Sequence, residues 1–442
     1  MKRQMKNAAF GGLMRHISLI ILLFASDALA EEFLVGTCVH FEAQKTDPAE
    51  FGAGSRKLGI NSFRAEIPWW DIEKVKGKLD FPSSLARVDR AIHDAVNLGG
   101  HPLLILGYGN QFYDNGSFPL SDTAQAAFVR YAQFVAIRYK HEVRHYELWN
   151  EWNIGSSTGH PIPYTYSGSA KDYSRLLTKV YRAIKAIDPN AIVIAGAVAN
   201  RDVLWINEMV KHADAQYDGI SVHPYNYSNG QEGRTPEEAV QWLNTLHELL
   251  PPPSSIFVTE MGWPTYAGPH TTDKDTAGDY LARFYLLSRE KPFIKGIWWY
   301  DFQDDGNNSA DSEQNFGIVS RGYLPKPAFF SMRDIAGQVV QANGAVDVEL
   351  GKNLRAVRLV GLNGKAVLAV WSLQQTGPQT IVLSSTAGHS EFSFLLVGAN
   401  TRLDGVKLGK NLSPVRLSVT GRPWLISGDV YSMVIQLIFP LL

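Results

Sequence analysis

The sequence predicts an α/β protein, a (β/α)8 barrel followed by a small antiparallel β-sandwich. Eight β-type runs alternate with helical runs over about 300 residues, an order typical of a closed parallel barrel. After about residue 340, strand-like runs follow one another with no helical stretch between them. We therefore expect a barrel at residues 31–338 and a sandwich at residues 339–442. A doubly wound open sheet is the alternative for the first part.

The first 30 residues have the pattern of a signal peptide. Four basic residues precede an apolar run at Ile17–Phe24, and Ala28-Leu29-Ala30 then offers small residues where a signal peptidase reads the chain. The basic residues are Lys2, Arg3, Lys6 and Arg15. The alternative is a membrane anchor, but the apolar run is shorter than the roughly 20 residues that a membrane span needs. We expect residues 1–30 to be removed and the mature protein to be secreted or periplasmic.

The eight β-type runs are short and are separated by amphipathic stretches. They are Phe33–His40, Ile60–Glu66, Pro102–Leu106, His145–Trp149, Ala191–Ala197, Gly219–Val222, Ile256–Thr259 and Ile294–Tyr300. One helical stretch runs from Tyr173 to Ile187 and closes at Asp188-Pro189. Another runs from Leu85 to Val96 and stops at Gly99-Gly100. Both place apolar residues at helical spacing, which predicts helices that pack on the strands.

The C-terminal part has hairpin signals. Leu354–Leu362 and Lys365–Trp371 are joined across Asn363-Gly364, a dipeptide that favours a type I′ turn. The closing run Tyr431–Leu442 is apolar, but it has only 12 residues and contains a glutamine and a proline. We expect a last sandwich strand there, with a peripheral membrane contact as the alternative.

Composition excludes several classes of function. Lysine and arginine number 42 against 43 aspartates and glutamates, which gives no reason to expect a nucleic acid or an anionic membrane as partner. Cys38 is the single cysteine, so no intrachain disulfide forms, and we expect it to be a buried small hydrophobe. No Cys/His cluster has zinc-ligand spacing and no glycine-rich loop has phosphate-binding context, so neither metal nor cofactor is expected. The acidic loop Asp304–Asn308 is expected to be a solvated turn.

Two glutamates follow β-type runs, where barrel enzymes place their chemistry. The segment His145–Asn153 puts Glu151 just past a strand, with an asparagine beside it, and Phe257–Pro264 puts Glu260 at the end of another strand. Because the strands of a barrel open at one face, these carboxylates converge on one pocket. Glycoside cleavage needs such a pair, one protonated to assist the leaving oxygen and one ionised to attack or to activate water. Either glutamate alone would more often be a surface or structural residue.

With both glutamates set among tryptophans, the sequence resembles clan A of the glycoside hydrolases. Within the clan it resembles family 39 and its bacterial exopolysaccharide-cluster relatives, over roughly residues 33–335. The resemblance implies that Glu151, preceded by Asn150, is the acid/base and that Glu260 is the nucleophile. It also implies retention of configuration through a covalent glycosyl-enzyme intermediate, with carboxyl groups about 5 to 5.5 Å apart.

The resemblance also implies roles for polar residues near other strand ends. His223 would touch the sugar, Tyr225 would hydrogen-bond the nucleophile, and Arg64 would hold the nucleophile ionised. A purely structural role is the alternative for both His223 and Tyr225. Glu66 could equally be the carboxylate that pairs with Arg64, in place of the nucleophile. Asn150 is expected to bond the sugar 2-hydroxyl, an interaction that strengthens at the transition state.

Tryptophans are plentiful, with 11 in the chain, and their flat rings suit stacking on sugars. Because side chains alternate along a strand, only one of Trp298 and Trp299 can form the floor of the sugar site, and we favour Trp299. Further aromatic residues on strand-end loops are candidates for more distant subsites, with core packing as an equal alternative. They are Trp69, Trp70, Tyr108 and Trp152.

The predicted function is therefore a retaining β-glycoside hydrolase that works outside the cytoplasm, endo-acting on a bacterial extracellular polysaccharide. The expected partner is the glycan itself, and the protein is expected to be a monomer. One alternative is an exo-acting β-xylosidase-like enzyme, which loops closing one end of the site would favour. The other is a barrel without catalysis that only holds glycan, and the presence of both glutamates in full context argues against it. Sugar identity and linkage depend on a few loop groups that sequence does not place.

Overall fold

The structure is a computed structural model that describes most of the chain. The described residues are 32–43, 45–155, 168–212, 216–252, 254–361, 365–373 and 377–438. The predicted signal segment and the Asn363-Gly364 turn lie outside these ranges, as does the end of the closing apolar run. In the described part, no helix is long and apolar enough to cross a membrane.

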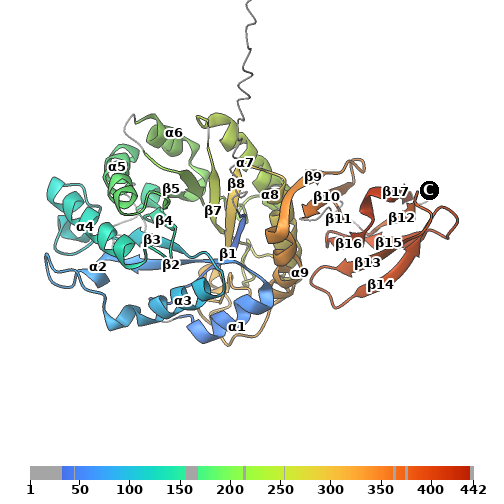
Figure 1. Cartoon of the computed structure of the whole chain (residues 1–442), viewed down its shortest axis with the longest axis horizontal. Helices are drawn as coiled ribbons and strands as arrows, with labels where there is room; N and C mark the ends of the chain where they lie inside the picture. The colour runs from blue at the N-terminus through green and yellow to red at the C-terminus, as the bar shows by residue number, and fades with distance from the viewer. Residues whose placement is uncertain are drawn as a thin grey trace, which may run out of the picture. The chain divides into compact units, whose positions relative to one another are not determined.

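Eight parallel strands form a closed barrel (Figure 1). Each strand pairs with its neighbour in the chain, and β1 also pairs with β8, which closes the sheet. The strands are β1 (Leu34–Cys38), β2 (Ser62–Pro68), β3 (Leu103–Gly107), β4 (His145–Leu148), β5 (Ile192–Val198), β6 (Gly219–Val222), β7 (Ile256–Met261) and β8 (Ile294–Trp299). This arrangement confirms the predicted barrel and excludes the doubly wound alternative.

The helices surround the barrel (Figure 1), and several of them start at a residue whose side chain caps the first turn. They are α1 (Pro48–Leu58), α2 (Trp69–Ile72), α3 (Ala86–Asn97), α4 (Asp122–Arg138), α5 (Ala170–Ile187), α6 (Val203–Lys211), α7 (Pro236–Leu249), α8 (Lys274–Arg289) and α9 (Pro327–Gln341). Ser169, Thr235 and Asp273 each accept a backbone N–H of the first turn of α5, α7 and α8. Such caps satisfy donors that the helix itself leaves unpaired.

The interior of the barrel is filled by side chains from alternating strand positions. A cluster that includes Leu103, Ile105, Phe257 and Trp298 occupies it. The large ring of Trp298 fits because β1 and β8 carry glycines beside it: a Cβ on Gly36 would lie 2.5 Å from Cδ1 of this ring. The outer faces of the strands pack on the helices in a second and larger core.

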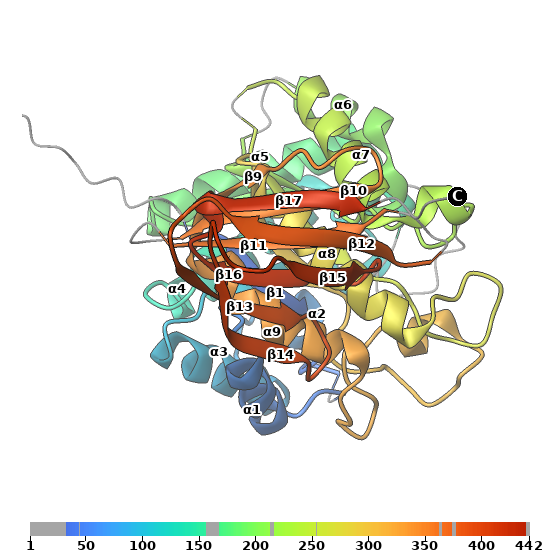
Figure 2. The ribbon, with the colours of Figure 1, turned by 90° about the vertical axis from the view of Figure 1, so that its right-hand side faces the viewer.

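Two antiparallel sheets follow α9 and form the sandwich (Figure 2). One has the order β14-β13-β16-β11-β10-β9 and the other the order β15-β12-β17. The strands are β9 (Ala342–Asp347), β10 (Leu354–Gly361), β11 (Ala366–Ser372), β12 (Gln379–Ser385), β13 (Ser390–Leu396), β14 (Arg402–Leu408), β15 (Val415–Val419), β16 (Trp424–Gly428) and β17 (Met433–Ile438). The change from helices to strands falls at Ala342. The closing apolar run contributes the edge strand β17.

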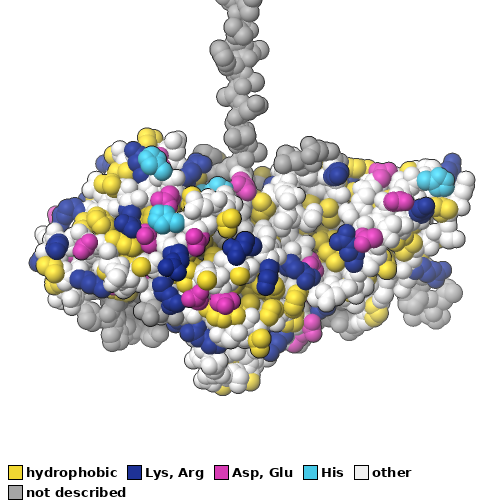
Figure 3. Space-filling model, turned by 60° about the horizontal axis from the view of Figure 1, so that its bottom comes forward, with side chains coloured by type: hydrophobic (Ala, Val, Ile, Leu, Met, Phe, Trp, Pro, Cys, Tyr) yellow, Lys and Arg dark blue, Asp and Glu magenta, His cyan; other side chains and the backbone are white. Residues whose placement is uncertain are grey.

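The sandwich is joined to the barrel helices by apolar and charged contacts. Trp371 of β11 is fully buried in the barrel's outer core, and its Nε1 donates to Glu237 of α7. Arg422 binds Asp275 and Asp279 on α8, and Arg355 binds Glu290. Elsewhere on the surface, basic and acidic side chains are interspersed on the face seen in Figure 3.

Candidate active site

The carboxyl ends of the barrel strands surround a cavity of about 610 Å³ that contains both predicted glutamates. Glu260 lies within β7, and Glu151 follows the end of β4. The lining residues come from segments at the ends of several strands, which is where a barrel positions catalytic groups. They are Cys38, Val39, His40, Arg64, Glu66, Ile105, Asn150, Glu151, Ile154, Ala199, Asn200, Tyr225, Tyr227, Ser228, Glu260, Tyr300, Glu313 and Phe316.

Glu260 is held by two hydrogen-bond donors. Nη1 of Arg64 donates to its Oε1 at 2.7 Å, and the hydroxyl of Tyr225 donates to its Oε2 at 2.9 Å. Burial alone would raise the pKa of this carboxyl, but His223, Arg64 and Tyr225 outweigh burial and hold the pKa below its usual value. Glu260 is therefore ionised near neutral pH, as a nucleophile must be. The expected contacts of Arg64 and Tyr225 with Glu260 are both present.

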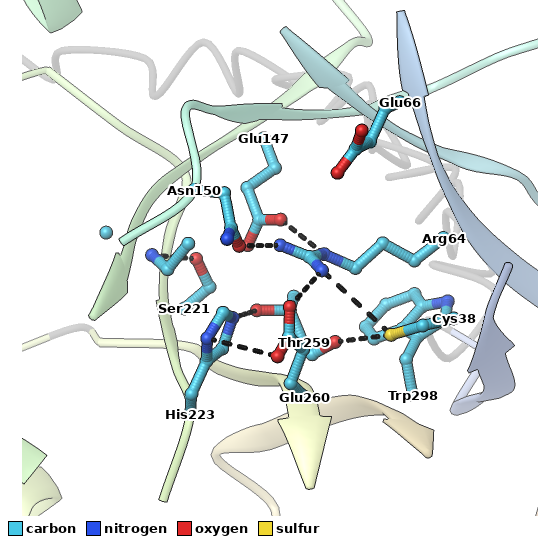
Figure 4. Close-up of polar contacts among 12 residues, drawn as sticks. Cys38, Arg64, Glu66, Glu147, Asn150, Ser221, His223, Thr259, Glu260 and Trp298 are labelled. Carbon is cyan, nitrogen blue, oxygen red and sulfur yellow. Dashed lines mark hydrogen bonds and ion pairs between the residues drawn. The ribbon is translucent and has the colours of Figure 1, made fainter. Parts of the chain in front are cut away.

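Besides Glu260, Arg64 hydrogen-bonds two residues in or just after β4, Glu147 and Asn150 (Figure 4). Its Nε donates to Glu147 at 2.6 Å, and its Nη2 donates to Oδ1 of Asn150 at 2.7 Å. Burial opposes the charged guanidinium, but Glu147 and Glu260 outweigh burial and raise the pKa of Arg64. Glu66, the other candidate partner, instead accepts a hydrogen bond from Tyr108.

Glu147 is a functional residue that the sequence reading missed. It lies inside β4, is fully buried, and carries the second negative charge around Arg64. A charged residue in the middle of a short buried strand was the available signal, since such a residue needs a buried partner of opposite charge.

Glu151 and Glu260 approach each other around His223. Nδ1 of His223 lies 3.0 Å from Oε1 of Glu151 and 3.5 Å from Oε2 of Glu260. On the other side of the ring, Nε2 lies 3.2 Å from the hydroxyl of Thr259. Each glutamate has a carboxylate oxygen within 4.8 Å of the other. This short separation matches a retaining glycosidase, because an inverting enzyme spaces its carboxyl groups about 6.5–9.5 Å apart.

The backbone around Glu151 adopts an uncommon conformation. Trp149 has a φ of 64° and Glu151 a φ of 51°, both in the left-handed region. For residues other than glycine this conformation costs roughly 1–2 kcal/mol each. Packing and hydrogen bonds compensate: Trp149 is fully buried, and the N–H of Glu151 donates to Ala197 at the end of β5. The β4 segment is thus held in a fixed turn that presents Glu151 to the cavity.

The tryptophans that we expected at the sugar site lie elsewhere, and this part of the prediction is corrected. Trp298 is inside the barrel, where its Nε1 donates to Ser62. Trp299 faces the other way and packs against Trp263. Both strand-8 rings are at most 1% exposed, because each face of a barrel strand is covered, one by the interior and the other by helices.

For Trp69 and Trp152, two of the tryptophans that we named as candidates for further subsites, the structure favours the alternative of core packing. Trp69 is fully buried, stacks on Tyr113, and donates through Nε1 to Glu73. Trp152 is fully buried and packs against Phe118 and Trp149. The aromatic groups that do line the cavity are Tyr225, Tyr227, Tyr300 and Phe316. Tyr300 directly follows β8. The aromatic residue that lines the cavity at this strand end is therefore one position after Trp299, the residue that we had favoured.

Two minor expectations can also be compared with the structure. Cys38 is buried, as expected, and its thiol donates to the carbonyl of Thr259 at 3.3 Å. The Asp304–Asn308 loop was expected to be solvated, and for Asp304 this is wrong. This aspartate is 6% exposed and accepts from Nζ of Lys326 at 2.6 Å, a buried ion pair that ties the loop to the start of α9.

Comparisons with known proteins agree with this geometry. The model of the cellulase family, glycosyl hydrolase family 5, matches residues 27–300. A solved structure of a family 39 glycoside hydrolase from Bacteroides cellulosilyticus WH2 is 23% identical, with a TM-score of 0.65 over 90% of this chain and 81% of that chain. No curated protein matches.

Two further solved structures share the fold at lower identity. A glucosidase from Croceicoccus marinus is 12% identical, with a TM-score of 0.62 over 90% of this chain and 96% of that one. An exo-β-1,4-mannosidase from Opitutaceae bacterium strain TAV5 is 16% identical, with a TM-score of 0.54 over 70% of this chain and 60% of that one. At these identities the likeness carries the fold alone.

The family match covers more than half of the chain and includes both glutamates. It confirms the expected clan, and family 39 is represented among the structural relatives. Together with the short distance between the two carboxylates, it identifies the chemistry as retaining cleavage of a glycosidic bond. The chain belongs to the cellulase family, glycosyl hydrolase family 5, and is a retaining glycoside hydrolase of clan A.

Proposed function

We propose that the protein cleaves a β-linked glycan by double displacement, with Glu260 as the nucleophile and Glu151 as the acid/base. The contacts of Glu260 support its role, because Arg64 and Tyr225 both donate to it and keep it charged. Glu151 has no arginine or lysine partner among the described ion pairs and is more exposed than Glu260, at 18% against 10% of the side chain. It is therefore the carboxyl with freer access to leaving group and water.

In the first step, an oxygen of Glu260 attacks the anomeric carbon while Glu151 gives its proton to the departing glycosidic oxygen. The C–O bond to the leaving group breaks as the ester to Glu260 forms. Asn150 supports this step through its NH2 group, because its Oδ1 is occupied by Arg64. We propose that this NH2 group donates to the 2-hydroxyl of the sugar.

In the second step, water attacks the anomeric carbon, and Glu151, now ionised, takes its proton. The ester bond breaks, and Glu260 leaves as a carboxylate. Arg64 and Tyr225 stabilise that departing charge through the hydrogen bonds that they already make. His223 lies within hydrogen-bond distance of Glu151 and near Glu260, so it fixes the relative position of the two carboxyls in both steps.

The observation that carries this proposal is the separation of less than 4.8 Å between carboxylate oxygens of the two glutamates. The test is the configuration of the first product. A panel of aryl β-glycosides and β-linked polysaccharides first identifies a substrate. Proton NMR then follows the anomeric signals during the first turnovers. We expect the β-anomer to appear first and to mutarotate later; an α-anomer formed first would contradict double displacement.

We further propose that the enzyme is endo-acting and works outside the cytoplasm on an extracellular polysaccharide. The signal-like N-terminal segment supports export. Trp70 supports binding beyond the central cavity: this residue is 38% exposed, and its ring stacks on Tyr108, whose hydroxyl bonds the cavity residue Glu66. A sugar stacked on Trp70 would belong to the same chain as the sugar at the glutamates.

The alternative is exo action of the β-xylosidase type, and product sizes separate the two. An endo enzyme releases a spread of oligosaccharides early and shortens the polymer quickly. If monosaccharide accumulates from the first minutes while the polymer keeps its length, the enzyme is exo-acting and the proposal of endo action is wrong. A barrel that only binds glycan would release neither product.

A further inference from the structure

The outer surface of the barrel carries a second pocket, which we call the α5 pocket. It has a volume of about 500 Å³ and lies on α5, the helix that packs between α4 and α6 (Figure 1). The described residues that line it are all polar, and none of them is acidic. A serine and a threonine contribute to the lining, and the other side chains are basic: Lys171, Arg175, Lys179, Arg182 and His212.

Four of these basic residues form a row along one face of α5. Lys171, Arg175 and Lys179 are spaced four residues apart, and Arg182 follows three residues later. Side chains at these spacings are neighbours on a helix, and the row extends over about 16 Å of helix length. Like charges at such spacings destabilise a helix. The row therefore does not serve the stability of α5 itself.

Two carboxylates near the row neutralise it only in part. Asp122 lies 3.6 Å from Arg175 and 3.6 Å from Lys179. Asp172 lies 3.7 Å from Arg175. The side chain of Asp122 is 86% exposed, and pairs this long and exposed contribute little free energy. Arg175 and Lys179 therefore remain available to a ligand.

The two ends of the row have no acidic partner among the described ion pairs. Lys171 is exposed, and Arg182 donates from Nε to the neutral amide of Gln216 at 2.9 Å. By contrast, Lys185 on the same helix lies 2.8 Å from Asp218. Closely paired and unpaired basic residues thus occur on one helix, and the unpaired ones lie at the pocket.

The row begins beside the turn that presents Glu151. Gly168, just before α5, donates its N–H to the carbonyl of Trp152 at 3.0 Å, and its own carbonyl accepts from Nε1 of Trp205. Lys171 lies in the first turn of α5, at the end of the barrel where the cavity lies. A polymer held along the row therefore stays close to the catalytic end of the barrel.

The chemistry of the lining indicates the class of ligand. Arginine and lysine recognise carboxylate, sulfate and phosphate groups, and several in a row suit a chain that repeats such a group. A membrane site would also present apolar side chains, and a site for single-stranded nucleic acid would present aromatic rings for stacking. The described lining of the α5 pocket has neither. An acidic polysaccharide offers repeated anionic groups among hydroxyls and needs no apolar contact.

We propose that the α5 pocket binds the anionic groups of an acidic polysaccharide, at a site separate from the catalytic cavity. The site holds the enzyme on such a polymer whether or not this polymer is the one that the enzyme cleaves. The proposal therefore goes beyond the function proposed above and does not depend on it.

Binding to α-linked polymers tests the proposal without interference from β-glycoside cleavage. Isothermal titration calorimetry at pH 7.5 and 50 mM NaCl compares polygalacturonate, which carries carboxylates, and dextran sulfate, which carries sulfates, with neutral dextran. We expect at least one anionic polymer to bind and dextran not to bind, and the polymer that binds more tightly identifies the preferred anionic group. Raising NaCl to 500 mM should weaken binding roughly tenfold or more, because salt screens exposed charges.

A double variant at the ends of the row and a matched control make the result specific. Lys171→Gln with Arg182→Gln removes two charges without leaving a described carboxylate unpaired, and should weaken binding roughly fivefold or more. Lys352→Gln with Lys410→Gln removes two exposed charges from the sandwich and should leave the affinity unchanged. Both double variants should cleave a small aryl glycoside as the wild type does, and circular dichroism checks that they are folded.

Several results would overturn the proposal. These are no binding of either anionic polymer, equal binding of dextran, or an equal loss in the two double variants, which would indicate net charge and not the α5 pocket. A further such result is binding to phosphatidylglycerol vesicles or to DNA that the variant at the row loses, while no acidic polysaccharide binds. Failure of the proposed function looks different, because the protein would then hydrolyse no β-glycoside while it still binds the acidic polymer.

Discussion

At the scale of single residues, the site depends on how one arginine is shared. Arg64 donates to Glu260, Glu147 and Asn150 with three different nitrogens, so its position and charge are fixed from three sides. The arginine then orients the amide beside Glu151 and keeps Glu260 ionised. Arg64 and Tyr225 donate to Glu260, whereas Glu151 has no arginine or lysine partner among the described ion pairs, and this difference supports the roles that we propose for the two glutamates.

The first prediction concerns Tyr225, which donates to Glu260. Tyr225→Phe removes this hydrogen bond and keeps the ring, so the pKa of Glu260 should rise. Hydrogen bonds to charged groups contribute about 1.5–3 kcal/mol, which corresponds to a rise of roughly one to two pH units. Because Glu260 must be ionised to attack, the acidic limb of the kcat/KM profile should move to higher pH. Tyr227→Phe, in the same cavity, is the control; equal shifts in both variants would disprove the role of Tyr225.

The second prediction concerns the acid/base. Glu151→Ala removes the proton donor, so substrates with poor leaving groups should slow by roughly 10²–10⁴-fold. Dinitrophenyl glycosides need no protonation and should slow far less in their first step, which burst kinetics can resolve. Azide, which attacks without a general base, should restore turnover of the activated substrate. If both classes of substrate slow to the same extent, Glu151 is not the acid.

At the scale of elements, sequence reasoning predicted strands and helices better than the direction of side chains. The eight strands and the two catalytic candidates followed from alternating runs and from residues at strand ends. Trp298 and Trp299 could not be assigned in this way, because in a closed barrel both faces of a strand are buried and alternation does not tell interior from helix side. The aromatic residue of this strand end that lines the cavity is Tyr300, which follows the last residue of β8, where strand alternation no longer applies.

The partners of buried charged residues could not be predicted from the sequence pattern either. Glu147 could be recognised as a charge in a buried strand, but its partner lies on β2 and is brought near only by the closed sheet. The same holds for Asp304 and Lys326, which are separated in sequence and meet in a buried pair. Sequence spacing predicts contacts within an element, whereas these contacts depend on how the elements fold together.

The third prediction concerns the elements that join sandwich and barrel. Arg422→Ala leaves Asp279 on α8 without its cation, which should destabilise the protein by about 1–3 kcal/mol. Burial raises the pKa of Asp279 to about 6, so this residue is largely neutral at pH 5 and charged at pH 8. The Tm deficit relative to wild type should therefore be larger at pH 8 than at pH 5.

Calorimetry at the two pH values measures this deficit. Arg402→Ala is the control, because Arg402 pairs with Asp404 on the surface, where ion pairs contribute little. Activity on a small aryl glycoside at 25 °C should be unchanged in both variants, since neither residue lines the cavity. A deficit that is the same at both pH values would show that the ion pair with Asp279 is not its cause.

At the scale of the whole molecule, the cavity and the exposed ring of Trp70 define the path that we propose for a glycan chain. The fourth prediction is that Trp70→Ala lowers kcat/KM on the polymer by roughly tenfold, because stacking in a distant subsite contributes binding energy that only long substrates use. Small aryl glycosides should be cleaved at the wild-type rate. Tyr431→Ala, which removes an exposed aromatic ring from the sandwich, is the control. Equal loss on long and short substrates would place Trp70 outside the glycan path.

The central claim is that Glu260 forms a covalent bond to the sugar, and trapping tests it most directly. A 2-deoxy-2-fluoro β-glycoside with a dinitrophenolate leaving group, built on the sugar that the substrate panel identifies, slows the second step and lets the ester accumulate. Mass spectrometry of the intact protein should show one added fluoroglycosyl group, and peptide mapping should place it on Glu260. Folded Glu260→Gln should stay unlabelled and show no turnover. A label on another residue, or substantial hydrolysis by Glu260→Gln, would contradict the mechanism.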